Sequence, residues 1–242
     1  MPTETIPLRA GEASALLDSP DAAPRAYALF AHCFTCSKDS KAAAYISRAL
    51  AAQRIATLRF DFSSLEFSSN IEDLIAAADW LRANRAAPRI LAGHSLGGAA
   101  VLAAAARIPE ARAIATIGAP FEPAHVSRLL GSSLDEIRSS GEASVDLGGR
   151  PFRIRKEFLD DLARQDPART LGALRKPLLV FHSPGDAIVD VENAAKIFLA
   201  AKHPKSFVSL DRADHLLTRR EDAQYVATVL AAWAWRYLDD EA

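Results

Sequence analysis

The residues best suited to chemistry in this chain lie in the segment 93–97, which reads Gly-His-Ser-Leu-Gly. A short apolar run, 90–92, precedes the segment and an Ala-rich stretch of helical composition follows it, which gives the strand, turn and helix of a nucleophile elbow. Such a turn exposes the Ser95 hydroxyl for attack on a carbonyl carbon and requires small residues on either side. The backbone N–H of Leu96, at the start of the helix, is then placed to stabilise the oxygen that becomes negative. The alternative is a glycine-rich turn with an incidental serine.

A serine hydroxyl is a poor nucleophile at neutral pH, and two later segments supply the base and the acid that would activate it. Asp186 follows an expected strand through the turn Pro-Gly-Asp, and His215 lies in the loop after the last expected strand. We predict that His215 takes the Ser95 proton and returns it to the leaving group, while Asp186 fixes the tautomer of the ring. Two alternatives remain: Asp186 only caps its turn, with Asp190 as the next candidate acid, or His215 is a solvated loop residue with Asp211 and Asp214 as its local partners.

The elements that must position these residues alternate between strand and helix. Residues 4–9 and 12–18, split by Ala10 and Gly11, predict an edge hairpin. Apolar runs predict further strands at 25–32, 55–60, 90–92, 111–117, 177–181 and 206–210. Helices are expected at about 38–53, with Ser37 or Asp39 as N-cap, at 69–85, from the elbow to 107, at 191–202 and at 221–238. Because the strands read as solid apolar runs, we expect a parallel sheet covered on both faces, with its active site at the carboxyl ends of the strands.

The alternation stops between residues 121 and 176. This insertion predicts helices at 124–130, 134–139 and 156–165, and a hairpin of 143–147 and 150–154 joined by Gly148 and Gly149. Because the insertion leaves the strand ends and must return to them, we expect it to cover the site as a lid. We expect one domain that spans residues 1–242 and includes this lid.

The loop at residues 32–39 (His-Cys-Phe-Thr-Cys-Ser-Lys-Asp) follows the first inner strand. A second oxyanion donor is expected at this place, and the N–H of Phe34 is preferred over that of Cys33. Cys33 and Cys36 form a Cys-x-x-Cys pair before a helix, a setting that can make a thiol reactive. We interpret the pair first as small buried residues that shape the loop, and second as a redox-sensitive switch beside the oxyanion hole.

Composition excludes several classes of function. Half of the 242 residues are apolar, and the net charge is −1 with no basic block, which argues against nucleic acid or an anionic membrane as a partner. The N-terminus lacks the pattern of a signal peptide, so we expect a cytoplasmic protein. The cysteines and histidines show no metal-binding spacing. We interpret His94 as packing in the elbow, His182 as the end of a strand, and His125 and His203 as surface residues.

Several motifs together resemble a known family. They are residues 32–39, 59–62 (Arg-Phe-Asp-Phe), 67–73 (Phe-Ser-Ser-Asn-Ile-Glu-Asp), 93–98, 118–121 (Gly-Ala-Pro-Phe) and 150–153 (Arg-Pro-Phe-Arg). The chain resembles, over nearly its whole length, the α/β-hydrolase half of bacterial proteins in which a serine hydrolase is fused to an OsmC-type peroxide reductase. The resemblance implies an α/β-hydrolase fold with a mostly parallel eight-stranded sheet, and the order Ser95, Asp186, His215 is the order of such enzymes.

The chain departs from this family in two places. It ends at Ala242, so we do not expect an OsmC half or a function that needs one in the same chain. After Asp61 the family has a longer Gly-rich loop, whereas here the chain runs almost directly into the next helix, which predicts a more open mouth to the site.

These observations predict a serine hydrolase that cleaves a small or medium carboxylic ester, or a thioester, through an acyl-Ser95 intermediate. No cofactor is expected, a small-molecule ester is the expected partner, and a homodimer is compatible with the sequence. Two alternatives remain. The same triad can make peracids from hydrogen peroxide or cleave carbon–carbon bonds, and a hydrolase-fold module can bind a ligand without catalysis.

Overall fold

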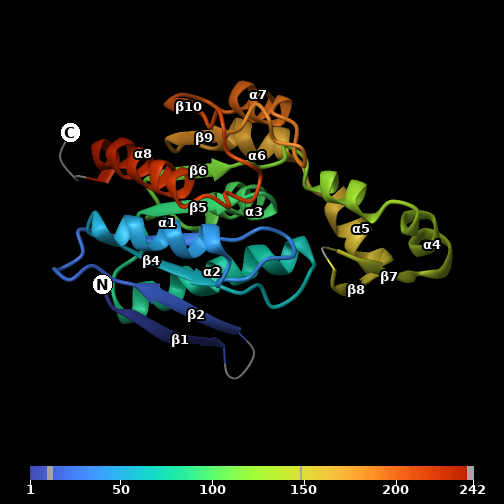
Figure 1. Ribbon diagram of the computed structural model, residues 1–242, viewed down its shortest axis with the longest axis horizontal. Coiled ribbons are helices and arrows are strands. Elements are labelled where there is room, and N and C mark those ends of the chain that lie inside the picture. The colour runs from blue at the N-terminus through green and yellow to red at the C-terminus, as the bar shows by residue number, and fades with distance from the viewer. Residues whose placement is uncertain (10–12, 148, 239–242) are drawn as a thin grey trace.

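A computed structural model describes residues 1–9, 13–147 and 149–238, which form an α/β body with a smaller block beside it (Figure 1). The described strands of the body form one eight-stranded sheet in the order β1-β2-β4-β3-β5-β6-β9-β10. All pairings from β4 to β10 are parallel, and β2 runs antiparallel to both of its neighbours. The mostly parallel sheet expected from the sequence is therefore confirmed. Its strands are β1 (Thr3–Arg9), β2 (Ala13–Asp18), β3 (Ala26–Ala31), β4 (Ile55–Phe60), β5 (Ile90–His94), β6 (Ala113–Ile117), β9 (Leu178–His182) and β10 (Lys205–Ser209).

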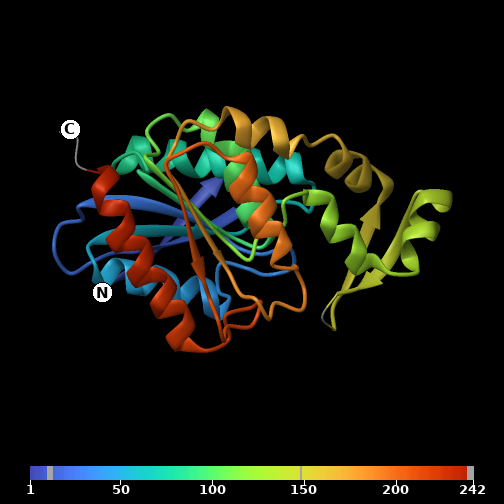
Figure 2. The ribbon, with the colours of Figure 1, turned by 90° about the horizontal axis from the view of Figure 1, so that it is seen from above.

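Helices cover both faces of the sheet (Figure 2). One face packs in one hydrophobic cluster with α1 (Lys41–Ala52) and α8 (Arg220–Leu238). The other face packs in a second cluster with α2 (Phe67–Asn84), α3 (Leu96–Ala104) and α7 (Glu192–Ala200). A short 3-10 helix, η1 (Ala105–Arg107), extends α3.

Burial on both faces explains why the inner strands read as solid apolar runs. Every residue of β4, β5, β6 and β9 is buried, whereas the edge strand β10 is half-exposed. A parallel strand between two helical layers has no solvent face on which polar residues could alternate. The carboxyl ends of these strands meet at one rim of the sheet, and the loops that leave this rim carry the predicted site residues.

Helix α1 begins at Lys41, and its N-cap is Ser40 rather than Ser37 or Asp39. The Ser40 side chain accepts a hydrogen bond from the Ala43 N–H at 3.4 Å. Residues 37–40 form a turn instead of helix, because the main-chain N–H and the ammonium of Lys38 both bind the Asp61 carboxylate at 2.7 Å. The prediction of the helix start was wrong because a partner at the end of β4 holds this turn.

The insertion contains η2 (Pro123–Leu130), α4 (Ser133–Ser140), β7 (Glu142–Asp146), β8 (Pro151–Arg155), α5 (Lys156–Ala163) and α6 (Pro167–Ala173). The predicted hairpin of the insertion is present as the antiparallel pair β7–β8. Gly148, in its predicted turn, lies outside the described residues, and so do Ala10, Gly11 and Glu12 in the turn predicted between β1 and β2. The helix predicted at 124–130 is a 3-10 helix, and α6 was missed. Asp166 caps α6 by accepting from the Arg169 N–H at 3.0 Å.

The elements α4, β7, β8 and α5 form the block that projects beside the body, on the side away from both termini (Figure 1). The block is tied to the body through α5. Its buried Asp161 carboxylate accepts a hydrogen bond from the Ser68 N–H at 2.8 Å and another from the Ser68 hydroxyl. Because Ser68 lies in the first turn of α2, the insertion supplies this helix with an N-terminal acceptor and the dipole favours the charge.

Candidate active site

Ser95 lies between β5 and α3 in a backbone conformation that L-residues rarely adopt. Its φ is 54° and its ψ is −126°. Such a conformation costs free energy and persists only where the surroundings impose it. The Ser95 N–H donates to the Ile117 carbonyl at the end of β6, over 2.8 Å, which ties the turn to the neighbouring strand. The structure therefore has the sharp turn that the sequence predicts, with the serine at its tip.

The glycines around Ser95 allow the main chains of three segments to touch. A Cβ on Gly93 would lie 2.2 Å from the Gly97 carbonyl oxygen, and a Cβ on Gly97 would lie 2.3 Å from the His32 carbonyl oxygen. Atoms cannot approach this closely, so each position excludes any side chain. The close contact of Gly97 with His32 also shows that the loop after β3 lies directly against the start of α3.

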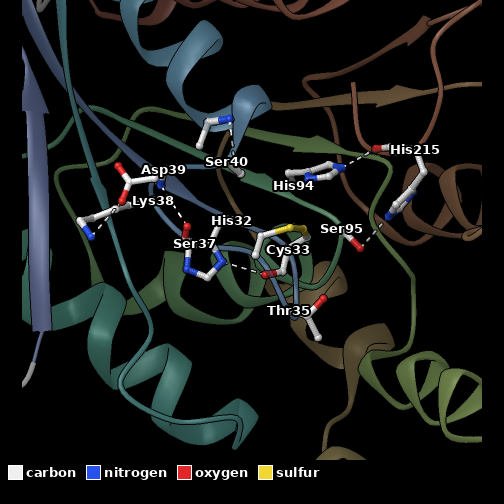
Figure 3. Close-up of a disulfide and its surroundings, with 12 residues drawn as sticks. His32, Cys33, Thr35, Ser37, Lys38, Asp39, Ser40, His94, Ser95 and His215 are labelled. Carbon is white, nitrogen blue, oxygen red and sulfur yellow. Dashed lines mark hydrogen bonds and ion pairs between the residues drawn. A yellow bond between two sulfur atoms is a disulfide. The ribbon is translucent and has the colours of Figure 1, made fainter. Parts of the chain in front are cut away.

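The side chains of Ser95, His215 and Asp186 are joined by hydrogen bonds. His215 Nε2 lies 3.0 Å from Ser95 Oγ (Figure 3), and His215 Nδ1 lies 2.7 Å from Asp186 Oδ2. The side chains of His215 and Asp186 are almost completely buried, whereas Ser95 is half-buried. The structure thus brings together all three residues that the sequence proposes, in the geometry of a nucleophile, a base and an acid that orients the base.

Asp186 is held as a carboxylate. Its Oδ1 accepts hydrogen bonds from the N–H groups of Ile188 and Val189, each at 2.9 Å. Burial acts to raise the pKa of Asp186, but the hydrogen bonds from His215 and from these two amides outweigh burial, and the pKa lies below its ordinary value. An ionised Asp186 keeps the His215 proton on Nδ1, which leaves Nε2 free to accept the Ser95 proton.

The alternative acids, Asp190, Asp211 and Asp214, form hydrogen bonds with groups other than the His215 ring. Asp190 Oδ1 accepts from the Glu192 N–H at 2.9 Å and so belongs to the start of α7. Asp211 pairs with the Ser209 hydroxyl at 2.6 Å, and Asp214 accepts from the Thr218 N–H at 2.9 Å. Within the described residues, Asp186 is therefore the acid that hydrogen-bonds His215.

His94 has a role that the sequence analysis missed. It is buried in the elbow, as predicted, but its Nε2 also lies 2.6 Å from the main-chain carbonyl of His215 and donates to it (Figure 3). Burial, followed by the proximity of His215, lowers the pKa of His94 to about 4, so the ring is neutral at physiological pH. The partner lies in a loop far along the chain, and no local pattern reveals it.

Gly118 and His182 complete the surroundings of the acid. Gly118 has a φ of 54°, and a Cβ there would lie 3.3 Å from Asp186 Oδ2 and 3.4 Å from His215 Nδ1. His182 ends β9, as predicted, and its Nε2 donates to the Val189 carbonyl at 2.8 Å. These residues fix the loop that carries Asp186, and the Gly-Ala-Pro motif at 118–120 is the sequence signal that could have identified the first of them.

The loop after β3 carries the candidate oxyanion donor Phe34. Its residues form a turn in which the Cys36 N–H donates to the Cys33 carbonyl at 3.1 Å. Leu96, the other candidate donor, is the first residue of α3, where the main-chain N–H groups lack partners within the helix. The contact between Gly97 and His32 places this loop beside the start of α3, as a shared oxyanion hole requires.

The insertion contacts this same loop at two points. The Phe34 ring stacks on Phe158 of α5, with centroids 5.3 Å apart and an interplanar angle of 16°. The Arg150 guanidinium, next to β8, donates a hydrogen bond to the Thr35 carbonyl. The insertion therefore lies against the segment that holds Phe34.

Cys33 and Cys36 are joined by a disulfide across the turn (Figure 3), with their Cα atoms 5.2 Å apart. This Cα separation lies within the range that disulfides adopt. The two residues shape the turn, as the first interpretation has it, and the disulfide closes a ring that includes Phe34. The redox-sensitive switch stays a prediction. In the described part of the chain, no cluster of three or more metal-ligating side chains is present. None of the helices there has the length and apolar composition needed to span a bilayer.

The fold and site together define the class of protein. The model of the α/β-hydrolase family matches residues 28–229, and the chain belongs to this family. A crystal structure of the esterase domain of a Rhodothermus marinus protein is 57% identical, with 98% of this chain and 99% of that chain covered and a TM-score of 0.82. This similarity supports a hydrolytic activity.

More distant structures share the fold. Est1E from Butyrivibrio proteoclasticus is 19% identical, with 98% and 99% of the two chains covered and a TM-score of 0.82. Dienelactone hydrolase from Anabaena variabilis is 20% identical, with the same coverage and a TM-score of 0.71. No curated protein matches the chain.

The close approach of main chains at Gly97 predicts that a single added methyl group destabilises the protein. Gly97→Ala should lower the free energy of unfolding by about 1–3 kcal/mol or more, because its Cβ meets main-chain atoms that cannot move independently. Gly172→Ala is the matched control: apart from its chain neighbours and the main chain of its own helix, no atom lies within 4 Å of a Cβ there, and alanine is the better helix former in α6. Urea unfolding followed by circular dichroism measures both. Equal unfolding midpoints would contradict the proposed crowding.

The Cys33–Cys36 ring predicts that the redox state affects the rate of ester cleavage. We expect oxidation to slow cleavage, because closing the ring pulls the loop tighter and displaces the Phe34 N–H, and loss of one oxyanion donor costs about 10²–10³ in turnover. Reductant should restore the rate, and Cys36→Ser should respond to neither reagent. Thiol titration beside the rate measurement checks this. If reductant and oxidant interconvert two free thiols and the disulfide while the rate of ester cleavage stays the same, the ring does not affect the Phe34 N–H.

Proposed function

We propose that this protein is a serine esterase that cleaves a small or medium carboxylic ester, or the corresponding thioester, through an acyl intermediate on Ser95. The observation that carries the proposal is the hydrogen-bonded chain from Ser95 through His215 to Asp186, with the serine on a strained turn. The similarity to an esterase domain at 57% identity supports the same conclusion. Ligand binding alone does not require a strained serine that is hydrogen-bonded to a buried histidine. The geometry therefore favours catalysis.

The reaction begins when Ser95 Oγ bonds to the ester carbonyl carbon while His215 Nε2 takes the hydroxyl proton. The carbonyl oxygen becomes an anion, which the N–H groups of Leu96 and Phe34 stabilise. The tetrahedral intermediate then collapses, the bond to the alcohol oxygen breaks, and His215 gives its proton to the departing alcohol. Asp186 stabilises the imidazolium in both steps.

Water completes the cycle. It loses a proton to His215 Nε2 as its oxygen bonds to the acyl carbon, and the second tetrahedral anion occupies the same hole. Collapse releases the carboxylic acid, and the proton returns to Ser95 Oγ. These steps draw only on the side chains, main-chain amides and water, and the proposal includes no cofactor.

We also propose that the insertion acts as a lid. Two contacts support this: Phe158 stacks on Phe34, and Arg150 binds the Thr35 carbonyl. Through them the position of the lid is coupled to the loop that carries an oxyanion donor, so the lid affects the chemical step as well as access.

Substitution of the triad tests the esterase proposal. Ser95→Ala and His215→Ala should each reduce kcat by up to about 10⁶ for p-nitrophenyl acetate. Asp186→Asn should lose about 10⁴, because it disturbs the tautomer without removing the base. Asp190→Asn is the control and should stay close to wild type, with circular dichroism confirming that every variant folds. Retained activity in Ser95→Ala, or a larger loss in Asp190→Asn than in Asp186→Asn, would contradict the assignment.

Arg150 tests the coupling of the lid to the oxyanion loop. Arg150→Ala should lower kcat by about tenfold with a smaller change in KM, because a loosened loop displaces part of an oxyanion donor worth about 10²–10³. Arg150→Lys keeps a donor and should recover part of the loss. Arg153→Ala is the matched control, since Arg153 pairs with Glu142 inside the hairpin at 2.8 Å. If Arg150→Ala and Arg153→Ala behave alike, the contact has no role in catalysis.

A further inference from the structure

A cavity of about 340 Å³ lies beside the oxyanion loop. Three segments form its walls. They are the loop after β3, which includes Phe34; the loop after β4, which includes Phe62 and Ser64; and the insertion, through Arg150 and Phe152. Of the residues with a role in the proposed ester cleavage, Phe34 lines this cavity, whereas Ser95, His215 and Asp186 do not.

The strand order places the cavity on the acyl side of the nucleophile. Ser95 follows β5, and the cavity lies over the ends of β3 and β4, whereas His215 follows β10 on the opposite side. The leaving alcohol must lie near His215 Nε2 in order to receive its proton, and the oxyanion occupies the hole. The remaining substituent of the tetrahedral carbon is the acyl group, which points away from His215 and toward this cavity.

His32, which lines the cavity, has a buried acceptor without a hydrogen-bond partner. Its Nδ1 lies 2.7 Å from the Cys33 carbonyl, which can only accept, so Nδ1 carries the proton. Burial is the main cause that lowers the pKa of His32, so the ring is neutral and Nε2 carries a lone pair. The side chain is 5% exposed, and no hydrogen-bond partner for Nε2 exists among the described residues.

The nearest charged oxygen cannot satisfy this nitrogen. Asp61 Oδ1 lies 3.9 Å from His32 Nε2, is itself an acceptor, and already receives the Lys38 N–H. A buried acceptor without a donor is costly, which favours a ligand that supplies a hydroxyl hydrogen. The hydroxyl of Ser64, on the cavity wall, is also without a partner in the described part of the chain.

Three of the residues that line the cavity are aromatic. The rings of Phe34, Phe62 and Phe152 line the cavity, and Phe62 meets His32 edge-on with centroids 4.8 Å apart. Aromatic side chains favour a flat apolar ligand, and the buried acceptor His32 Nε2 sets where its polar group must lie.

We propose that this cavity binds the acyl group of the substrate and selects a flat aromatic acyl group that ends in a hydroxyl, whose O–H donates to His32 Nε2. The inference rests on the proposed esterase function and names its substrate class: esters of hydroxyaryl carboxylic acids. The alcohol side of the ester is outside the cavity.

A pair of esters that differ only in the hydroxyl tests the proposal. Wild-type enzyme should cleave methyl 4-hydroxycinnamate with a kcat/KM at least about tenfold above that for methyl cinnamate, because a site with an unpaired buried acceptor rejects the analogue that lacks the donor. A ratio near one in the wild-type enzyme would overturn the proposal.

His32→Asn is the informative variant. The asparagine amide can take the place of Nδ1–H at the Cys33 carbonyl, and no acceptor remains where Nε2 was, so the ratio should fall to about one. His32→Phe, which removes both nitrogens, is the second variant and should give the same ratio if His32→Asn does not fold. His125→Asn is the control, because His125 lies outside the cavity and binds the Ile188 carbonyl. An unchanged ratio in the His32 variants would overturn the proposal.

The failure of this inference is distinguishable from the failure of the esterase proposal. p-Nitrophenyl acetate, whose acyl group has neither a ring nor a hydroxyl, and labelling of Ser95 by a phosphonate report on the esterase alone. If both succeed and the hydroxyl ratio is near one, only the acyl-group assignment is wrong. If both fail, the esterase proposal and the inference fall together.

Discussion

The close approach of main chains around Ser95 is the constraint on which the site depends. Gly93 and Gly97 leave no room for a Cβ, so β5, α3 and the loop after β3 touch through backbone atoms. This contact holds Ser95 in a backbone region that costs about 1–3 kcal/mol. It also brings the N–H of Leu96 and the loop that carries Phe34 to the same side of the serine. The strained turn at Ser95 and the positions of the two proposed oxyanion donors therefore depend on the same contact.

The other half of the site comes from loops far along the chain, and several independent contacts fix it. His215 is held by Ser95 and Asp186 through its ring and by His94 through its main chain. Asp186 is held by amides of its own turn, which keep it ionised despite burial. Because His94 stays neutral, it orients the loop of His215 without adding a positive charge beside the imidazolium of the proposed mechanism.

The sequence was sufficient to predict the features that local residue patterns encode. It was not sufficient where a residue far along the chain determines the local structure or a side-chain contact. Solid apolar runs identified the inner strands because burial on both faces leaves no other composition. The elbow followed from its glycine spacing and flanking segments, and Asp186 and His215 followed from their places after expected strands. The start of α1 was misplaced because Asp61 holds Lys38 in a turn. The link from His94 to His215 and the unpaired His32 Nε2 are three-dimensional facts without a local signature.

The central claim is that Ser95 carries the acyl group during turnover. Rapid acid quench of the enzyme with p-nitrophenyl acetate, followed by mass spectrometry of the peptides, tests it most directly. The account predicts a transient mass increase of one acetyl group on the peptide that contains Ser95, formed within the first turnover and lost as acetate is released. Ester cleavage without any acylated intermediate, or acylation at a residue other than Ser95, would contradict the account.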